Sequence, residues 1–338
     1  MRFLILHPQQ HAATGNRVTA ERFRQGLAQR GHQVRLLGVH PGSGAPVQNL
    51  CRAWEPDAAL LLHAFRSGVP WLASAAPTPF AVLLTGTDIH EGLDHPEQAG
   101  VIREVLQRAG AILAQAPQTV EALKSAFPEW AARLRHLPAG IHLGDRPFPL
   151  RKVLGLSPDI PVFLHPAGVR PVKGNLELLA IFAPLAASGP PFRLVFCGPV
   201  LDPDYGRAFV AEVARHPWAA YLGVVPPEAM PATLREADVV LNNSRSEGLS
   251  NVLIEAAVLG RPLLATAIAG NQAVIRNGIN GYCCADAAEF TRRAEELLRD
   301  PELRRRLSQP RSLYPPDQES DCLEQCLVAL ADQPVSRA

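Results

Sequence analysis

Two glutamates in the second half of the sequence flank a predicted turn between a strand and a helix. Glu247 lies just before that helix, and Glu255 lies about one and a half turns inside it. Ser250 is the predicted N-cap residue of the helix, and Gly260 is its predicted C-terminal stop. Because an ionised carboxylate only accepts hydrogen bonds, this pair suits a ligand rich in hydroxyl groups, such as a sugar or a ribose.

Both acids also have a simpler interpretation. Glu247 could be a solvated acid that the helix dipole stabilises, and Glu255 could be a surface residue. The sequence neighbours of Glu255 are almost all apolar from Val252 to Val258, which is typical of a largely buried helix. An unpaired acid in such a helix is costly, so a ligand or partner is expected for Glu255.

The backbone between the two acids predicts an anion site. The N–H groups of Gly248, Leu249, Ser250 and Asn251 surround the start of the helix, where they have no partner within the helix itself. The helix dipole adds a partial positive charge at the same place. We therefore expect this segment to bind phosphate.

Two cations lie in a second loop of the same half. Arg170 and Lys173 fall in residues 165–174, which follow a predicted strand and precede a predicted helix. An arginine offers a planar fork and a lysine a point charge, and both suit phosphate. Lys173 is one of only three lysines among 33 basic residues, so lysine is not the default cation here. The alternative is that both are solvated loop residues.

The first half of the chain carries weaker signals. Gly15 and Asn16 follow the first predicted strand, where a glycine would let the backbone approach a phosphate, although the segment could be an ordinary turn. Asp88 and His90 follow another predicted strand, and either could orient or deprotonate a second substrate. Asp88 could instead cap the next helix. His63 also ends a predicted strand and could be packed or catalytic. No set of residues with metal-ligand spacing is recognisable.

Strands and helices alternate along the whole sequence, and they must position these residues. The predicted strands are residues 3–7, 33–38, 58–63, 80–85, 111–115, 161–165, 192–197, 219–224, 238–242, 262–266 and 281–284. The predicted helices include 19–30, 99–109, 176–187, 227–237, 251–259, 287–298 and 318–331. Near-continuous apolar strands separated by helices indicate parallel doubly wound sheets, an α/β fold.

The 338 residues are enough for about two domains. The pattern breaks at residues 142–149, a polar stretch with prolines, which is the predicted linker. We expect an N-terminal domain at 1–148, a C-terminal domain at 149–316, and a final helix and tail at 317–338. Ligands of such sheets bind outside the carboxyl ends of strands, which is where the candidate residues fall.

Composition excludes several classes of partner. With 33 basic and 32 acidic residues the formal net charge is +1, so a bulk polyanion such as nucleic acid is not an expected partner. No run approaches the length of a membrane span, and peripheral membrane contact stays open. The first residues are too short an apolar run for a signal peptide. Six cysteines without CxxC spacing indicate reduced thiols, and we expect a cytoplasmic protein.

The order of these segments resembles the retaining nucleotide-sugar glycosyltransferases of family 4, which have the GT-B fold. The two glutamates have seven residues between them, as in the signature of that family. The matching segments are residues 221–226, 237–241, 246–256, 260–266 and 280–281, together with the loop at 165–174 and the opening pattern at 14–17. Three departures are visible. Arg170 and Lys173 are separated by two residues where the family usually has four, Ser250 replaces a usual glycine, and Ala269-Gly270 replaces a common glycine pair.

The resemblance implies two facing Rossmann-like domains with a cleft between them. It implies a transferase that moves a hexosyl group, with retention of configuration, from a UDP- or GDP-sugar to an unidentified acceptor. Arg170, Lys173 and the helix start near Gly248 would stabilise the diphosphate, with no essential metal and no cofactor besides the donor substrate. Glu247 would hold sugar hydroxyls and Glu255 the ribose.

Three alternatives remain open. A selenosugar or thiosugar synthase would use a selenium or sulfur nucleophile in place of an alcohol. A nucleotide-sugar 2-epimerase would need a dedicated acid and base that the sequence does not identify. A noncatalytic nucleotide-sugar-binding protein would have no productive acceptor site. The sequence names neither the sugar, the base, the acceptor nor the oligomeric state.

Overall fold

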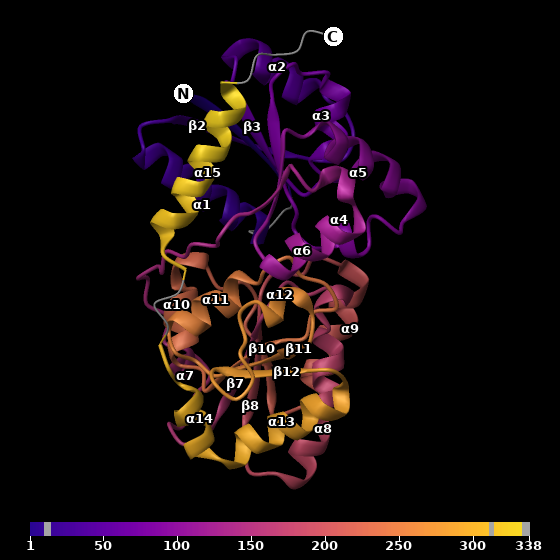
Figure 1. Ribbon diagram of the computed structural model, residues 1–338. Coiled ribbons are helices and arrows are strands. Elements are labelled where there is room, and N and C mark those ends of the chain that lie inside the picture. Colours follow the sequence, from indigo (N-terminus) through magenta and orange to yellow (C-terminus); the bar gives the residue numbers. More distant parts are fainter. Residues whose placement is uncertain (10–14, 311–313, 333–338) are drawn as a thin grey trace. The chain divides into compact units, whose positions relative to one another are not determined.

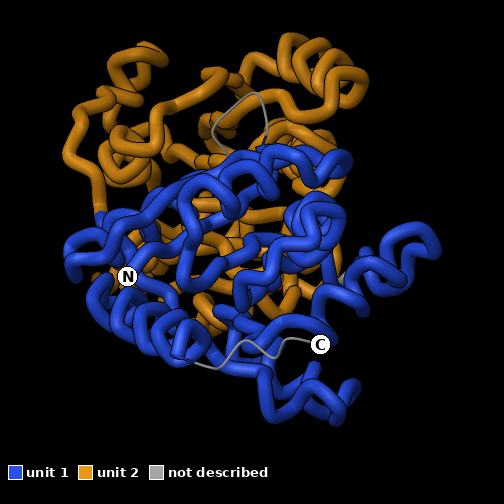
Figure 2. Tube along the Cα trace, turned by 90° about the horizontal axis from the view of Figure 1, so that it is seen from above, with its two compact units in different colours: residues 1–142, 314–338 blue, residues 143–313 orange. Residues whose placement is uncertain are grey.

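The chain forms two compact units, each built around one parallel sheet. The computed structural model describes residues 1–9, 15–310 and 314–332 (Figure 1). Unit 1 comprises Met1–His142 and Tyr314–Ala338, and unit 2 comprises Leu143–Leu313 (Figure 2). The predicted α/β class with two doubly wound halves is confirmed. The change of unit falls at His142, at the start of the predicted linker rather than at its end.

The sheet of unit 1 has six parallel strands in the order β2-β1-β3-β4-β5-β6. These strands are β1 (Arg2–Pro8), β2 (Gln33–Val39), β3 (Ala58–Leu62), β4 (Phe80–Leu83), β5 (Ala111–Ala114) and β6 (Leu134–His136). The helices are α1 (Gly15–Gln29), α2 (Ala45–Trp54), α3 (Gly68–Ser74), α4 (Thr87–His90), α5 (Pro96–Arg108), α6 (Pro117–Ala126), the short η1 (Pro128–Trp130) and α15 (Pro316–Ala331). Strand β6 is not among the predicted strands, because only its first residue is buried.

The sheet of unit 2 also has six parallel strands, in the order β12-β11-β10-β7-β8-β9. The strands are β7 (Val162–Pro166), β8 (Arg193–Cys197), β9 (Ala219–Tyr221), β10 (Val239–Asn242), β11 (Leu263–Thr266) and β12 (Gly281–Cys284). The helices are α7 (Leu150–Val153), η2 (Pro171–Lys173), α8 (Asn175–Ser188), α9 (Pro203–Ala214), η3 (Pro227–Ala229), α10 (Met230–Arg235), α11 (Asn251–Val258), α12 (Ala269–Gln272), α13 (Ala287–Arg299) and α14 (Pro301–Leu307).

Alternation along the strands explains why both faces of each sheet are buried. In β1, Leu4 and Leu6 belong to one hydrophobic cluster of unit 1, while Phe3 and Ile5 belong to another. Successive side chains of a strand point to opposite faces, so the two clusters lie on opposite sides of the sheet. Helices cover both faces of such a sheet, which is why the strands read as continuous apolar runs.

The C-terminal helix α15 belongs to unit 1 rather than standing apart as a separate segment. It packs against α1, β3 and β4, and its Leu323 and Leu327 are fully buried. Arg22 of α1 forms a buried ion pair with Glu319 of α15, with Nε to Oε2 at 2.6 Å and Nη2 to Oε1 at 2.9 Å. Gln115 Nε2 also donates to Glu319 Oε1, at 2.8 Å.

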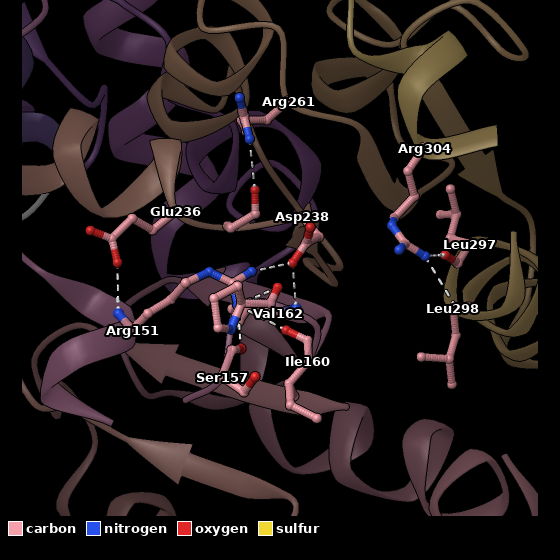
Figure 3. Close-up of polar contacts among 12 residues, drawn as sticks. Arg151, Ser157, Ile160, Val162, Glu236, Asp238, Arg261, Leu297, Leu298 and Arg304 are labelled. Atoms are coloured by element: carbon pink, nitrogen blue, oxygen red, sulfur yellow. Dashed lines mark hydrogen bonds and ion pairs between the residues drawn. The ribbon is translucent and has the colours of Figure 1, made fainter. Parts of the chain in front are cut away.

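Arg151 holds together the segments at which strands of the unit 2 sheet begin (Figure 3). Arg151 of α7 donates from Nη2 to Asp238 Oδ2 at 2.6 Å and from Nη1 to the carbonyl of Ile160 at 2.9 Å. Asp238 also accepts from the backbone N–H of Val162 at 2.8 Å, and Glu236 accepts from the N–H of Arg151 at 2.6 Å. These bonds join α7 to the start of β7 and β10, the two strands whose other ends carry the candidate residues.

The six cysteines are free thiols, and five of them are buried, as the sequence indicates. Within the described residues, no helix is both long and apolar enough to span a bilayer.

Candidate functional site

The strand order of unit 2 has its reversal point between β7 and β10. From β7 the chain builds β8 and β9 on one side, and then crosses back to place β10, β11 and β12 on the other. Ligands of open parallel sheets bind outside the carboxyl ends of the strands at this point. The loop after β7 carries Arg170 and Lys173, and the loop after β10 carries Glu247. The fold therefore brings together the two loops that the sequence singles out.

Lys173 and Glu247 form an ion pair at this edge of the sheet, from Lys173 Nζ to Glu247 Oε1. The side chains are largely buried, at 15% and 14% exposed. Ser244 Oγ and Asn242 Nδ2 also donate to Glu247 Oε1, at 3.0 Å and 3.4 Å. Burial alone would raise the pKa of Glu247, but the Lys173 charge and these hydrogen bonds together hold that pKa below its usual value. Glu247 is therefore an ionised acceptor at neutral pH.

Two hydrogen bonds to backbone carbonyls hold the two loops against each other. Asn243 Nδ2 donates to the carbonyl of Gly174 at 3.0 Å, and the N–H of Arg245 donates to the carbonyl of Val172 at 2.9 Å. Gly174 has φ +61°, and a Cβ on it would lie 2.5 Å from Asn243 Nδ2. Only glycine combines that φ with so close an approach. The position of Lys173 is therefore set by its glycine neighbour.

Helix α11 begins as the sequence predicts. Ser250 is its N-cap residue and accepts from the N–H of Leu253 at 3.4 Å, while Asn242 Nδ2 donates to Ser250 Oγ at 3.1 Å. This cap gives a physical reason for a serine at a position where the resemblance leads one to expect glycine. Gly248, Leu249 and Asn251 lie in the turn and first position of the helix, which ends before Gly260 at φ +67°. Their N–H groups are at a helix N-terminus, the geometry that suits an anion.

The other two predicted residues of unit 2 lie on the same elements. Arg170 stands in extended conformation just before η2, and its N–H donates to Asn175 Oδ1 at 3.3 Å. Glu255 is half-buried in α11, one turn beyond Asn251. Arg170, Lys173 and Glu247 thus lie on the two loops beside the reversal point, and α11 begins where the second of these loops ends.

His165 was not singled out by sequence reasoning, yet it lies beneath this pair. It is near the end of β7, fully buried, with its ring edge against Phe196. Neither ring nitrogen has a hydrogen-bond partner among the residues that the structure describes. Burial and the charge of Lys173 lower the pKa of His165 to about 3, against the opposing effect of Glu247. The ring is therefore neutral and adds no charge to the site. Its position at a strand end was the available signal.

Unit 1 has its own reversal point, between β1 and β3. Gly15 and Asn16 form the first turn of α1, which follows β1, and a Cβ on Gly15 would meet no atom within 4 Å. Thr14, which precedes them in the expected pattern, lies outside the described residues, as does the side chain of His90.

Asp88, a candidate for orienting or deprotonating a second substrate or for capping the next helix, is enclosed in the structure. Its side chain is fully buried, and both carboxylate oxygens accept from backbone N–H groups, of Ala64 at 2.8 Å and Thr85 at 3.0 Å. The carboxylate therefore joins the loops that follow β3 and β4. A base must reach the proton that it removes, and this one is occupied and enclosed.

His63 occupies the strand end beside Asp88 in an unusual conformation. Its φ is +76°, which is rare for a residue with a side chain. Nδ1 accepts from the N–H groups of Phe65 at 3.3 Å and Arg66 at 3.2 Å, so the ring proton must be on Nε2. Nε2 then donates to Thr87 Oγ1 at 3.2 Å. A polar group of defined tautomer thus lies at the carboxyl edge of unit 1.

Comparison with known proteins identifies a family that matches most of unit 2. Residues 149–310, which contain the loops of Lys173 and Glu247 and the whole of α11, match the family described as glycosyl transferases group 1. Unit 2 belongs to the group 1 glycosyltransferases. The resemblance seen in the sequence is confirmed by this match.

Relatives of this group 1 glycosyltransferase include a protein that aligns over most of its length. Glycosyltransferase 1 domain-containing protein 1 of Xenopus tropicalis is 26% identical over 303 residues, covering 88% of this chain and 87% of that protein. D-inositol 3-phosphate glycosyltransferase of Geodermatophilus obscurus is 28% identical over 229 residues, covering 62% of this chain and 51% of that enzyme. The chain therefore spans only about half of this second relative.

Solved structures share the fold of this glycosyltransferase over nearly its full length. Sucrose-phosphate synthase from Thermosynechococcus elongatus has a TM-score of 0.82 at 18% identity, covering 97% of this chain and 98% of that one. Anabaena HepE in complex with UDP and glucose has a TM-score of 0.76 at 18% identity, covering 98% and 100%. At this identity the likeness establishes a GT-B-like fold.

Proposed function

We propose that this group 1 glycosyltransferase moves a hexosyl group, with retention of configuration, from a UDP- or GDP-sugar to an acceptor that is not yet identified. Unit 2 would bind the donor and unit 1 the acceptor. The observation that carries the proposal is the contact between Lys173 and Glu247 beside the N-terminus of α11. A cation, an ionised carboxylate and a helix start therefore lie on adjoining loops of one sheet edge.

Each of these groups suits one part of the donor. Arg170, Lys173 and the amides near Gly248 would hold the diphosphate and stabilise the charge that develops as it leaves. The second oxygen of Glu247, Oε2, would accept from sugar hydroxyls, and Glu255 from the ribose. HepE was solved with UDP and glucose on the same fold, which supports this class of donor.

Because of the same charges, we propose that the reaction needs no metal ion. A departing diphosphate needs positive charge, and Arg170, Lys173 and the helix N-terminus offer it from the protein. We therefore expect turnover to survive a chelator such as EDTA. Loss of turnover in EDTA, with recovery on adding a divalent cation, would contradict this part of the proposal.

The direct test is release of nucleotide from a panel of UDP- and GDP-sugars, measured with and without candidate acceptors. Release with at least one donor is expected, and saturable binding without release from any donor would overturn the enzymatic function. Lys173→Ala and Glu255→Ala should each weaken donor binding by roughly tenfold or more, because each removes a charged contact. Unchanged affinity in both variants would remove the assigned donor site.

The panel also separates the alternative activities. Sulfide or selenide as the acceptor, giving release where alcohols give none, would identify a thiosugar or selenosugar synthase. Conversion of the donor to its 2-epimer without an acceptor would identify an epimerase.

A further inference from the structure

The ion pair between Lys173 and Glu247 joins two groups that the proposed function assigns to different parts of the donor. Lys173 would serve the diphosphate and Glu247 the sugar. In the structure, the charge of Lys173 is neutralised by the Glu247 carboxylate. A diphosphate therefore meets a lysine that has an anionic partner.

Glu247 cannot easily follow Lys173 when a ligand draws the lysine away. Ser244 Oγ and Asn242 Nδ2 both donate to the same carboxylate oxygen, Oε1, that contacts Lys173. The backbone of Ser244 is itself held, since its carbonyl accepts from Thr266 Oγ1 at 2.6 Å. Gly270 packs so closely that a Cβ on it would lie 2.9 Å from the Glu247 carbonyl. The carboxylate is fixed, whereas Lys173 has a long flexible stem.

Within the described residues, the ion pair and the side-chain hydrogen bonds of Glu247 all involve the same oxygen, Oε1, and none involves Oε2. A sugar hydroxyl can therefore be accepted at Oε2 while Oε1 keeps its bonds from Ser244 and Asn242. A nucleotide sugar offsets the loss of the Lys173 contact with this new hydrogen bond. A nucleoside diphosphate without sugar brings only negative charge toward a fixed carboxylate.

We propose that Glu247 competes with the diphosphate for Lys173, and that this competition makes the site prefer the nucleotide sugar over the free nucleoside diphosphate. The inference rests on the proposed function. The carboxylate then has a role beyond holding the sugar: it recaptures Lys173 once the sugar has left, which weakens the hold on the product.

The test is a double-mutant cycle on the full chain, with affinities from titration calorimetry. The variants are Glu247→Gln, Lys173→Met and the double variant, and the ligands are UDP, GDP, UDP-glucose and GDP-mannose. Glu247→Gln should bind the nucleoside diphosphate roughly tenfold more tightly, because Lys173 is then free. In the Lys173→Met background the same substitution should change the affinity by about twofold or less, since no cation remains to be released.

A matched control removes an acid near the same loops without touching Lys173. Glu177 of α8 pairs with the exposed Arg245, at 2.6 Å between Oε1 and Nη2. Glu177→Gln should leave the affinity for the nucleoside diphosphate within about twofold, because exposed charges are screened. Thermal melting of every variant confirms that each is folded before its affinity is compared.

The outcomes distinguish this inference from the function on which it rests. If the wild-type chain binds UDP or GDP and Glu247→Gln binds it no more tightly, the competition is wrong and the donor site stands. If Glu247→Gln raises the affinity for the nucleoside diphosphate equally in the wild-type and Lys173→Met backgrounds, Glu247 simply repels the phosphates. That result also overturns the competition. If the wild-type chain binds none of the four ligands, the proposed donor class is wrong and the inference ends with it. A smaller ratio of nucleotide-sugar to diphosphate affinity in Glu247→Gln completes the expected result.

Discussion

At the scale of single residues, the site combines a charged pair with a neutral ring beneath it. His165 lies within electrostatic reach of both Lys173 and Glu247, but its burial keeps it uncharged. A protonated ring there would repel Lys173 and would have no water around it. The fold therefore depends on His165 staying neutral, and this dependence can be measured.

Acid should destabilise the wild-type chain partly through His165. Its folded pKa, about 3, lies below the value of 6.5 in an unfolded chain, so the unfolded state binds the proton first. Stability is thus fully present above pH 6.5 and falls by roughly 1.4 kcal/mol per pH unit as the pH drops toward 3. His165→Phe should lack this component. Urea unfolding of both proteins at a series of pH values measures it, and parallel pH curves would contradict the prediction.

At the scale of elements, the loops after β7 and β10 fit together through close backbone approach. Gly174 at φ +61° is in contact with Asn243, whereas Gly155 of the same unit has φ +62° and open space around its Cα. The two glycines share a backbone conformation and differ only in what a methyl group would meet. Comparing the two alanine variants therefore separates the free-energy cost of a side chain at positive φ from the cost of displacing the loop.

Gly174→Ala should weaken donor binding, and Gly155→Ala should not. Both substitutions place a side chain at positive φ, which costs about 1–2 kcal/mol of stability each. Only the first also drives a methyl group to 2.5 Å from Asn243 and so shifts Lys173. Donor affinity by calorimetry should fall roughly tenfold or more in Gly174→Ala alone. Equal affinities in the two variants would show that the loop contact does not position the site.

At the scale of the whole molecule, the end of the chain completes the unit formed by its beginning. Helix α15 is separated from α1 by nearly the full sequence, yet Arg22 and Glu319 are only 8% and 1% exposed. A buried charge whose partner is removed is costly. The ion pair therefore makes the stability of unit 1 depend on residues beyond unit 2 in the sequence.

Glu319→Ala should destabilise unit 1 by roughly 3–5 kcal/mol, because it removes the buried ion pair with Arg22. Three of the four tryptophans, Trp54, Trp71 and Trp130, are in unit 1, so tryptophan fluorescence during urea unfolding reports mainly on this unit. Glu104→Ala, which breaks an exposed pair with Arg108 in the same unit, serves as the control and should cost less than about 1 kcal/mol. A similar small change in both variants would show that the buried pair does not hold α15 in place.

The sequence by itself determined what depends on neighbours along the chain. Apolar runs marked most of the strands, because side chains of a strand buried on both faces are almost all apolar. Ser250 and Gly260 marked the ends of α11, because capping is a local interaction. The two loops whose groups suit phosphate were recognised in the same way. The short β6 was not predicted, because a strand with one buried residue has no such pattern.

Only the tertiary structure decided which of these groups meet. Lys173 and Glu247 are 74 residues apart, and their contact follows from the strand order that sets β7 beside β10. The burial of Asp88 follows from the pairing of β3 with β4, which encloses its carboxylate between two loops. Strand order and helix docking are set by packing free energy summed over a whole unit, so no short segment specifies them.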